Sequence, residues 1–327
     1  METMICSYSS DARTLYKADI YKVLSMPKGF IVHFRYKKKY VDDSIVTQLN
    51  DYIGKEVIIF YTLTKENKNI PIRKAKLVKV EINEETGLFH AYMELDKFTN
   101  LELEKEKPTD KFFTSQNIKF KNEDINWIDK IEQVKDSFKD MLFYHIKSIT
   151  DYNGKVIPIK HRKDKKASWY KLSHGKKYFI ELSIGNPKES ESKLSFTSSS
   201  MDVTANISNP IEITAQYDDI SVPIYIKSLN VSNDSSIISF SPTSVDNLIN
   251  TEYNLNIEIS KSIGYFKPIA FGILTLLALV GFVLVKDGYD SFSRLFSWQS
   301  PIDSGLVLGV FLLVLSSTLL FYFFNKK

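Results

Sequence analysis

Two short runs of the sequence combine basic and aromatic side chains, a composition that suits the binding of phosphate-bearing ligands. One is residues 35–40 (RYKKKY), and the other is residues 160–177 (KHRKDKKASWYKLSHGKK), in which eight of eighteen residues are Lys or Arg. Lys and Arg neutralise phosphates and release counterions, while aromatic rings stack on bases at roughly 1–3 kcal/mol each. The two runs therefore predict a polyanion site formed by Arg35, Lys37, Lys38, Lys39, Lys160, Arg162, Lys163, Lys165, Lys166, Trp169, Tyr170 and Lys171.

Composition alone leaves three interpretations of these runs open: a nucleotide or single-stranded oligonucleotide site, a lipid-headgroup site, and a solvated hairpin loop. Each Lys or Arg beside an anionic leaflet contributes about 1 kcal/mol, but only within a Debye length of about 8 Å. The second run lies about ninety residues before the nearest strongly apolar segment. We therefore expect a phosphate-bearing ligand in preference to lipid, with the solvated loop as the alternative.

The charge distribution is uneven along the chain. Residues 155–177 carry nine Lys or Arg against one acid, whereas residues 178–264 carry four against eleven, although the formal net charge is only +4. A basic block that precedes an acidic module is more informative than the average charge.

Motifs of catalysis and metal binding are missing from the sequence. There is no glycine-rich phosphate loop, no nucleophile elbow and no pair of histidines at metal-binding spacing, and the five histidines are scattered. Cys6 is the only cysteine, so an intrachain disulfide cannot form, and we expect it to be inert. The sequence predicts no enzyme, no cofactor and no metal.

The elements that must position the basic runs read mainly as strands in residues 1–110. Stretches 29–36, 56–62, 72–82 and 88–95 are rich in β-branched and aromatic residues, and Asn83–Gly87 has the composition of a hairpin loop. Residues 42–53 predict a short helix that ends at Gly54. We expect a small β-barrel or curled-sheet module.

Residues 111–150 predict a linker and an amphipathic helix, because apolar residues recur at helical spacing over 124–149. From 151 to 263, seven strand-like runs at about ten-residue spacing, separated by turn residues, predict an immunoglobulin-like antiparallel β-sandwich.

The last region, 264–327, contains two apolar segments, at about 266–285 and 305–324, each long enough to cross a bilayer. Lysines outside the segments and acids between them predict a two-helix transmembrane hairpin in the plasma membrane, in contact with lipid and with both termini cytoplasmic. Small residues at close-packing spacing indicate a homo-oligomer, and hydroxyl groups are the available lining of a pore. The residues expected at an oligomer or pore interface are Gly305, Gly309, Ala278, Gly281, Thr275, Ser316, Ser317 and Thr318.

This layout, β-rich sensor modules ahead of a two-helix membrane hairpin, resembles the membrane effectors of bacterial anti-phage defence systems, such as the channel effector of the Hailong-type system. The resemblance covers the order of the regions and no specific motif. It implies a soluble region that senses a nucleotide or oligonucleotide, helices that assemble into a pore or channel, and a partner protein that produces or presents the ligand. The alternative is a non-channel membrane tether or accessory subunit whose β-sandwich docks a partner protein. A third interpretation places the soluble region outside the cell.

Overall fold

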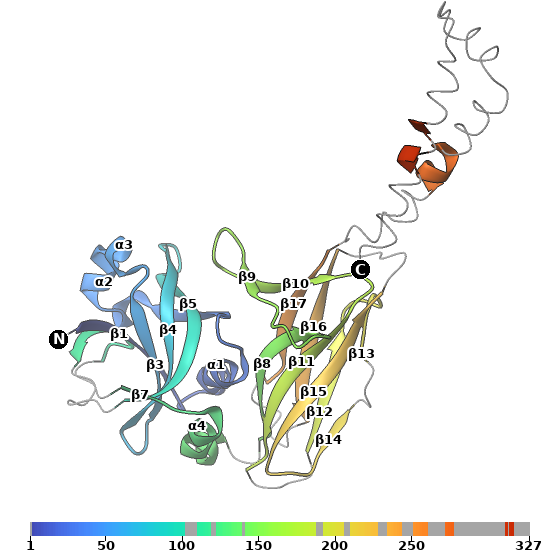
Figure 1. Ribbon diagram of the computed structural model, residues 1–327. Coiled ribbons are helices and arrows are strands. Elements are labelled where there is room, and N and C mark those ends of the chain that lie inside the picture. Colours follow the sequence, from blue (N-terminus) through green and yellow to red (C-terminus); the bar gives the residue numbers. More distant parts are fainter. Residues whose placement is uncertain are drawn as a thin grey trace, which may run out of the picture. The chain divides into compact units, whose positions relative to one another are not determined.

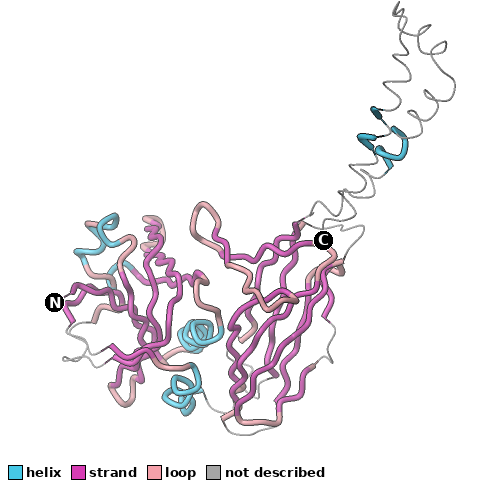
Figure 2. Tube along the Cα trace, viewed as in Figure 1, coloured by secondary structure: helices cyan, strands magenta, loops and turns pink. Residues whose placement is uncertain are grey.

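A computed structural model of the chain describes residues 2–101, 110–118, 122–138, 141–187, 192–205, 210–227, 234–243, 251–260, 272–277, 311–312 and 314–316. The chain divides into two compact units, Met1–Ser260 and Lys261–Lys327. The first unit is β-rich with few helices (Figures 1 and 2).

The first part of this unit is a seven-stranded sheet. Its strands follow the order β2-β5-β4-β3-β1-β6, with β7 paired to β5, and only β1 and β3 run parallel. The strands are β1 (Glu2–Ser10), β2 (Ile31–Lys37), β3 (Glu56–Leu63), β4 (Lys68–Asn83), β5 (Leu88–Leu101), β6 (Phe113–Ile118) and β7 (Asn122–Asp124).

The two edges of this sheet approach each other. The segment after β2 meets the start of β6 through a bridge between Val41 and Phe113, and the Phe112 amide donates to the Tyr40 carbonyl at 2.7 Å. An open sheet would leave both edges unpaired, so these contacts curl it toward a barrel. The hairpin predicted at Asn83–Gly87 is confirmed: it joins β4 to β5, and Gly87 adopts φ +62°.

Helix α1 (Thr14–Ser25) lies between this sheet and the second half of the unit (Figure 1). The Tyr21 hydroxyl donates to the Leu142 carbonyl at 2.5 Å, and the Tyr253 hydroxyl donates to the Ala18 carbonyl at 2.5 Å. Arg73, which is 1% exposed, donates to the Val23 and Met26 carbonyls near the end of the helix at 2.9 and 2.7 Å. Buried donors that find acceptors in this way fix α1 firmly in place.

Two predicted helices differ from those observed. Residues 42–53 form two short helices, α2 (Asp43–Thr47) and α3 (Leu49–Tyr52), and Gly54 follows at φ +91°. The helix expected over 124–149 is only partly right: α4 (Trp127–Val134) and the 3-10 turn η2 (Lys135–Phe138) occupy its first half, but its second half is strand β8 (Phe143–Asp151).

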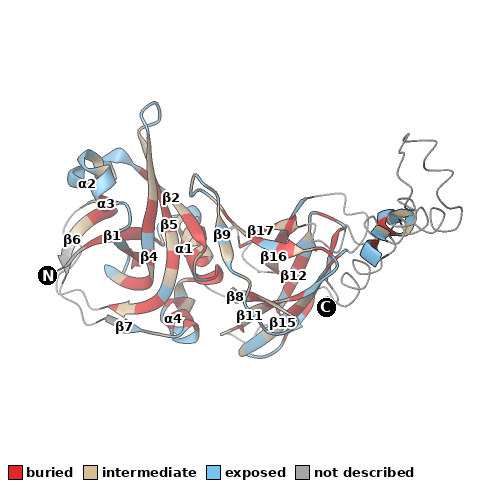
Figure 3. Ribbon diagram, turned by 45° about the horizontal axis from the view of Figure 1, so that its top comes forward, coloured by how far each residue is buried: buried red, intermediate tan, exposed pale blue. Residues whose placement is uncertain are grey.

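The second part of the unit is sandwich-like, with a six-stranded sheet, β14-β12-β16-β17-β10-β9, and a four-stranded sheet, β13-β15-β11-β8. Alternate residues of β11 and β17 are buried and join one hydrophobic core (Figure 3). The pairing is antiparallel except between β10 and β17, which run parallel. The further strands are β9 (Ile159–His161), β10 (Ser168–Ser173), β11 (Lys177–Gly185), β12 (Ser192–Ser198), β13 (Val203–Ala205), β14 (Ile211–Ile213), β15 (Tyr217–Ile226), β16 (Ser235–Thr243) and β17 (Tyr253–Ser260).

In the second unit, residues 272–277, 311–312 and 314–316 are helical. No helix within these described stretches is long and apolar enough to cross a membrane. Most of the two apolar segments lies outside the described residues. Of the residues predicted at an oligomer or pore interface, only Thr275 and Ser316 are described, while Gly305, Gly309, Ala278, Gly281, Ser317 and Thr318 lie outside.

Candidate functional site

The second basic run forms the hairpin β9–β10, at the edge of the six-stranded sheet. Its turn is held by hydrogen bonds from the Arg162 amide to the Ala167 carbonyl (3.1 Å) and from the Lys165 amide to the Arg162 carbonyl (2.8 Å). Asp164 accepts from the Lys166 amide at 3.1 Å. Lys165 adopts φ +53°, a left-handed conformation that favours glycine.

This hairpin is fastened to the first sheet by a buried serine. The Ile31 amide, at the start of β2, donates to the Ser168 hydroxyl at 2.9 Å, and His161 Nδ1 lies 3.2 Å from the same oxygen. Ser168 is 1% exposed, so water cannot replace these bonds readily. The run of lysines in the turn is thereby held over the outer face of β2, β5 and β4.

An ion pair also holds the hairpin against the first sheet. Lys166 Nζ lies 2.8 Å from Glu81 on β4 and 5.9 Å from the centre of the Tyr92 ring on β5. Glu81 also contacts Lys79 at 3.1 Å and accepts from the Tyr92 hydroxyl at 3.3 Å. The hydrogen bond from Lys166, followed by that from Lys79, lowers the pKa of Glu81 to about 2. Lys166 is therefore already paired within the protein.

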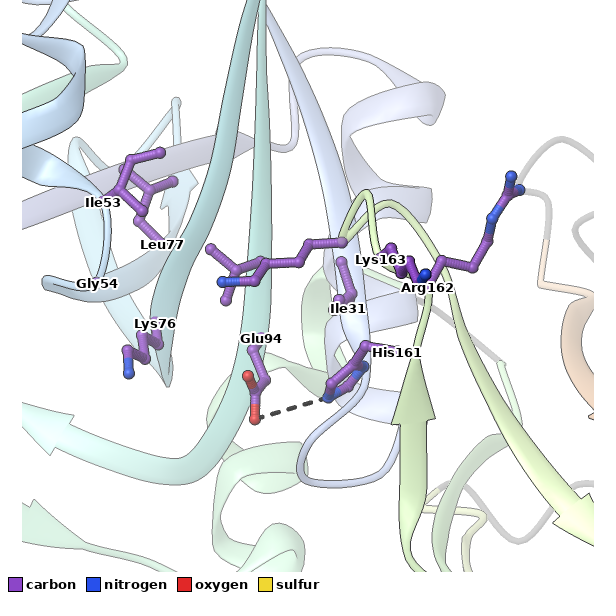
Figure 4. A pocket seen from close by; sticks show the side chains of 11 residues that line it. Ile31, Ile53, Gly54, Lys76, Leu77, Glu94, His161, Arg162 and Lys163 are labelled. Atoms are coloured by element: carbon purple, nitrogen blue, oxygen red, sulfur yellow. Dashed lines mark ion pairs between the residues drawn. The ribbon is translucent and has the colours of Figure 1, made fainter.

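Between the hairpin and the sheet lies a pocket of about 350 Å³, shown in Figure 4. This volume is near the lower end of the roughly 300–1,000 Å³ that small-molecule sites span. Its lining residues come from β2, from β4 and β5, from the turn after α3 and from the hairpin: Ile31, Ile53, Gly54, Lys76, Leu77, Val78, Glu94, His161, Arg162, Lys163 and Lys165.

The charges around this pocket are mostly positive and uncompensated. In the described part of the chain, no ion pair within 4.0 Å involves Lys76, Lys163 or Lys165. The side chain of Arg162 extends away from Glu94 and lies 3.8 Å from Asp164, so its guanidinium would have to turn to reach a ligand (Figure 4). Three ammonium groups beside a concave surface attract anions.

Other residues of the second run do not line the pocket. Tyr170 is 2% exposed and packs into the sandwich core, which prevents its ring from stacking on a base. Lys171 pairs with Glu258 on the neighbouring strand β17 at 2.8 Å. Lys160 and Trp169 stand opposite each other in the β9–β10 register and are not among the lining residues.

The first basic run lies at the far end of β2. Arg35 and Lys37 are exposed on the strand, and Lys38 and Lys39 fall in the 3-10 turn η1 (Lys38–Tyr40). Lys38 lies 3.6 Å from Glu84, and Lys39 lies 4.9 Å from the centre of the Tyr40 ring. At about 3.3 Å per residue, Arg35 and Lys37 lie four and six residues along β2 from Ile31 at the pocket, or about 13 and 20 Å.

The face between the two runs is occupied by stacked rings. The centre of the His33 ring is 4.5 Å from that of Tyr92 and 5.0 Å from that of His90. Burial, and then the neighbouring His90, lower the pKa of His33 to about 4, so this ring is neutral at pH 7. The structure therefore does not merge the two runs into one site.

Sequence reasoning missed the residues that the sheet contributes, chiefly Lys76, Glu81, Tyr92 and Glu94. For Lys76 and Glu81 the signal is the charged residues of 72–82 (IRKAKLVKVEI), all of which are at least partly exposed on β4 except the buried Arg73. Finding Glu94 requires the strand register, in which Ile31 and Lys76 are its partners on either side.

Comparisons with known proteins add little to this geometry. No family model matches the sequence, and no curated protein matches it significantly. Among solved structures, the chain is similar to a FixG-related protein from Vibrio parahaemolyticus (11% identity, 27% of this chain and 81% of that one, TM-score 0.22). It is also similar to domains 4 and 5 of the S-layer protein SbsC (9% identity, 35% of this chain and 55% of that one, TM-score 0.20). Likenesses this low carry no functional argument.

Proposed function

We propose that the chain is a membrane-anchored effector whose β-rich unit senses an anionic nucleotide or oligonucleotide at the pocket between the β9–β10 hairpin and the first sheet. The observation that carries this proposal is the set of three amines, Lys76, Lys163 and Lys165, which surround a concave surface without ion pairs to described residues. Exposed lysines on a convex surface are solvated, whereas a concave low-dielectric wall concentrates their field and favours a bound anion.

The strand pairing offers a route from the pocket to the end of the first unit. Strand β10, which begins at Ser168 beside the pocket, pairs with β17 as far as Ser173 and Ser260. The Asn256 side chain donates to the Ser168 carbonyl at 3.1 Å, and Lys171 and Glu258 form an ion pair. Because these contacts join β10 to β17, a ligand that displaces the hairpin would also displace β17. This strand precedes the apolar segments in the chain.

The rest of the proposal depends on sequence. The sandwich-like part is proposed to be immunoglobulin-like, and the segments at about 266–285 and 305–324 are proposed to form a plasma-membrane hairpin with cytoplasmic termini. Assembly of these hairpins into a homo-oligomer would create a pore or channel controlled by the ligand. A bacterial anti-phage role, with a partner protein that produces or presents the ligand, is proposed on the same layout.

Expression of the full chain in bacterial cells tests the effector role. We expect a defined oligomer in detergent and a loss of membrane potential that depends on the pocket. The double variant Lys163→Glu/Lys165→Glu should lose that effect, whereas Lys37→Glu/Lys39→Glu, which changes the net charge equally, should keep it. A monodisperse monomer that leaves the potential unchanged would contradict the proposal and favour the tether whose sandwich docks a partner.

A further inference from the structure

The pocket is chemically two-sided. Lys163 and Lys165 come from the hairpin, while the sheet side presents Lys76 together with the carboxylate of Glu94 and the apolar residues Ile31 and Val78. Glu94 Oε1 lies 4.0 Å from His161 Nε2 (dashed line in Figure 4). The Glu94 side chain keeps 37% of its surface exposed. A carboxylate in the wall would repel an anion that carries no hydrogen-bond donor.

The position of Glu94 is fixed by the sheet. It stands on β5 directly between Ile31 on β2 and Lys76 on β4, so its side chain shares their face of the sheet. A phosphate about 4 Å from this carboxylate would be repelled by about 1–4 kcal/mol, according to the local dielectric. The same oxygens are acceptors for hydroxyl or amino donors. The pocket therefore selects a ligand that combines anionic groups with a hydrogen-bond donor.

The apolar part of the wall points to a flat, weakly polar portion of the ligand. Ile53 supplies the exposed apolar surface of the lining and is 39% exposed, whereas Ile31 and Val78 are only 5% and 8% exposed and Leu77 is fully buried in the core. A sugar phosphate would leave this surface unused, whereas a nucleoside base could cover it. The three amines, which form no ion pair with any described residue, suit a chain of more than one phosphate.

We propose that the ligand is a nucleoside di- or triphosphate, with a sugar hydroxyl or a base amine donating to Glu94 and the phosphates facing Lys163, Lys165 and Lys76. This inference rests on the proposed function and narrows it, because a pocket of about 350 Å³ matches a single small ligand, and the rest of an oligonucleotide would extend beyond the lining residues. Glu94 is the specificity-determining residue of the site.

The test is isothermal titration of the full chain in detergent, at constant ionic strength, with ATP, GTP, CTP, UTP, inorganic tripolyphosphate and a mixed-sequence single-stranded 12-mer. We expect at least one nucleotide to bind tenfold or more tightly than tripolyphosphate. Glu94→Gln should lower the affinity for that nucleotide and raise the affinity for tripolyphosphate, each severalfold. The preference for the nucleotide over tripolyphosphate would then be lost. The control Glu84→Gln, at the tip of the β4–β5 hairpin, should leave both affinities unchanged. Matching thermal unfolding of the variants shows that each is folded.

The outcomes separate the two proposals. If tripolyphosphate binds as tightly as every nucleotide, or if the 12-mer binds most tightly, the nucleotide assignment is overturned while the anion sensor stands. If Glu94→Gln tightens nucleotide and tripolyphosphate alike, the donor role of the ligand is overturned. If none of these anions binds, both proposals fail.

Discussion

The two basic runs of this chain have similar composition, but they lie in different surroundings in the folded protein. Lys38 and Lys39, in the first run, lie beside Glu84 and the Tyr40 ring at the far end of β2, where they form no part of the pocket. In the second run, Lys163 and Lys165 project from a hairpin that is fastened over an opposing sheet. The density of positive charge is therefore a poor guide to a binding site. What distinguishes the second run is that another surface faces it.

The largest expected difference between the two runs is in anion affinity. Lys163→Glu/Lys165→Glu and Lys37→Glu/Lys39→Glu both bring the formal net charge from +4 to zero. We expect the first variant to bind inorganic tripolyphosphate at least 100-fold more weakly, about 2.7 kcal/mol, because two attractions become repulsions in a partly enclosed site. The second should change affinity less than threefold in the same titration. Equal losses would show that only overall charge matters.

The second-largest effect concerns the hydrogen bond that holds the hairpin against the first sheet. Ser168→Ala leaves the buried Ile31 amide without its acceptor, which should lower the free energy of unfolding by about 1–3 kcal/mol. Ser195→Ala, on β12, is a matched control because no side-chain hydrogen bond involves Ser195 in the described structure. This variant should change the free energy of unfolding by less than about 0.5 kcal/mol. Urea unfolding in detergent measures both. If the two variants unfold at the same concentration, Ser168 does not fasten the hairpin.

A smaller effect comes from the strained turn that presents the amines. Lys165→Gly relieves the left-handed backbone at φ +53°, whereas Lys165→Ala retains it, and both remove the same amine. The glycine variant should be more stable than the alanine variant by about 1 kcal/mol, while both weaken tripolyphosphate equally. Such a result would show that backbone stability is given up at this turn to present a charge. An alanine variant as stable as the glycine variant would exclude that explanation.

The smallest effect compares one ion pair from each run. A double-mutant cycle of Lys166→Ala with Glu81→Gln should give a coupling of about 0.5–1 kcal/mol, and Lys38→Ala with Glu84→Gln, at 3.6 Å on a more exposed surface, should give about zero. Because the folded pKa of Glu81 is lowered to about 2, its contribution is complete above the unfolded value of about 4.5 and is lost as the pH falls toward 2. The cycle repeated at pH 7 and pH 3 measures this loss. A coupling for Lys38 and Glu84 as large as that for Lys166 and Glu81 would remove the distinction between the two runs.

Much of the fold could be predicted from sequence where one face of an element is buried and the other is not. Strands β11 and β17 are predictable near their observed positions for this reason, whereas β3, which is buried throughout after Glu56, is predictable from its β-branched and aromatic residues. Helix α1 was missed because it packs against the first sheet on one side and β8 on the other, so it has no continuous polar stripe. Strand β1 was missed because buried serines at positions 7, 9 and 10 hide its apolar pattern.

The error at residues 141–149 has a different cause. The pairing of β8 with β11 shifts register between Glu181 and Leu182, so the buried residues of β8 do not alternate strictly. The buried residues of β8, at positions 143, 144, 146 and 149, instead fall at spacings that one face of a helix would also give. Local pattern could not decide between the two, because only the partner strand reveals the shift.

Only the hairpin side of the candidate site could be predicted from the sequence. Charge density identifies Lys163 and Lys165, but it also groups with them Lys160 on β9 and Trp169, Tyr170 and Lys171 on β10, which do not line the pocket. Lys76 and Glu94 came from strands whose register the sequence does not specify. A pocket formed by two segments far apart in the chain depends on tertiary contacts such as Ile31 to Ser168, which leave no local signal.

Hydrogen–deuterium exchange of the full chain in detergent, with and without saturating inorganic tripolyphosphate, tests the central claim most directly, because it reports on both runs in one sample. The account predicts slower exchange in residues 160–168 and 76–78 and no change in residues 35–40. Protection of residues 35–40 with none in the hairpin would contradict the account and place the anion on the first run.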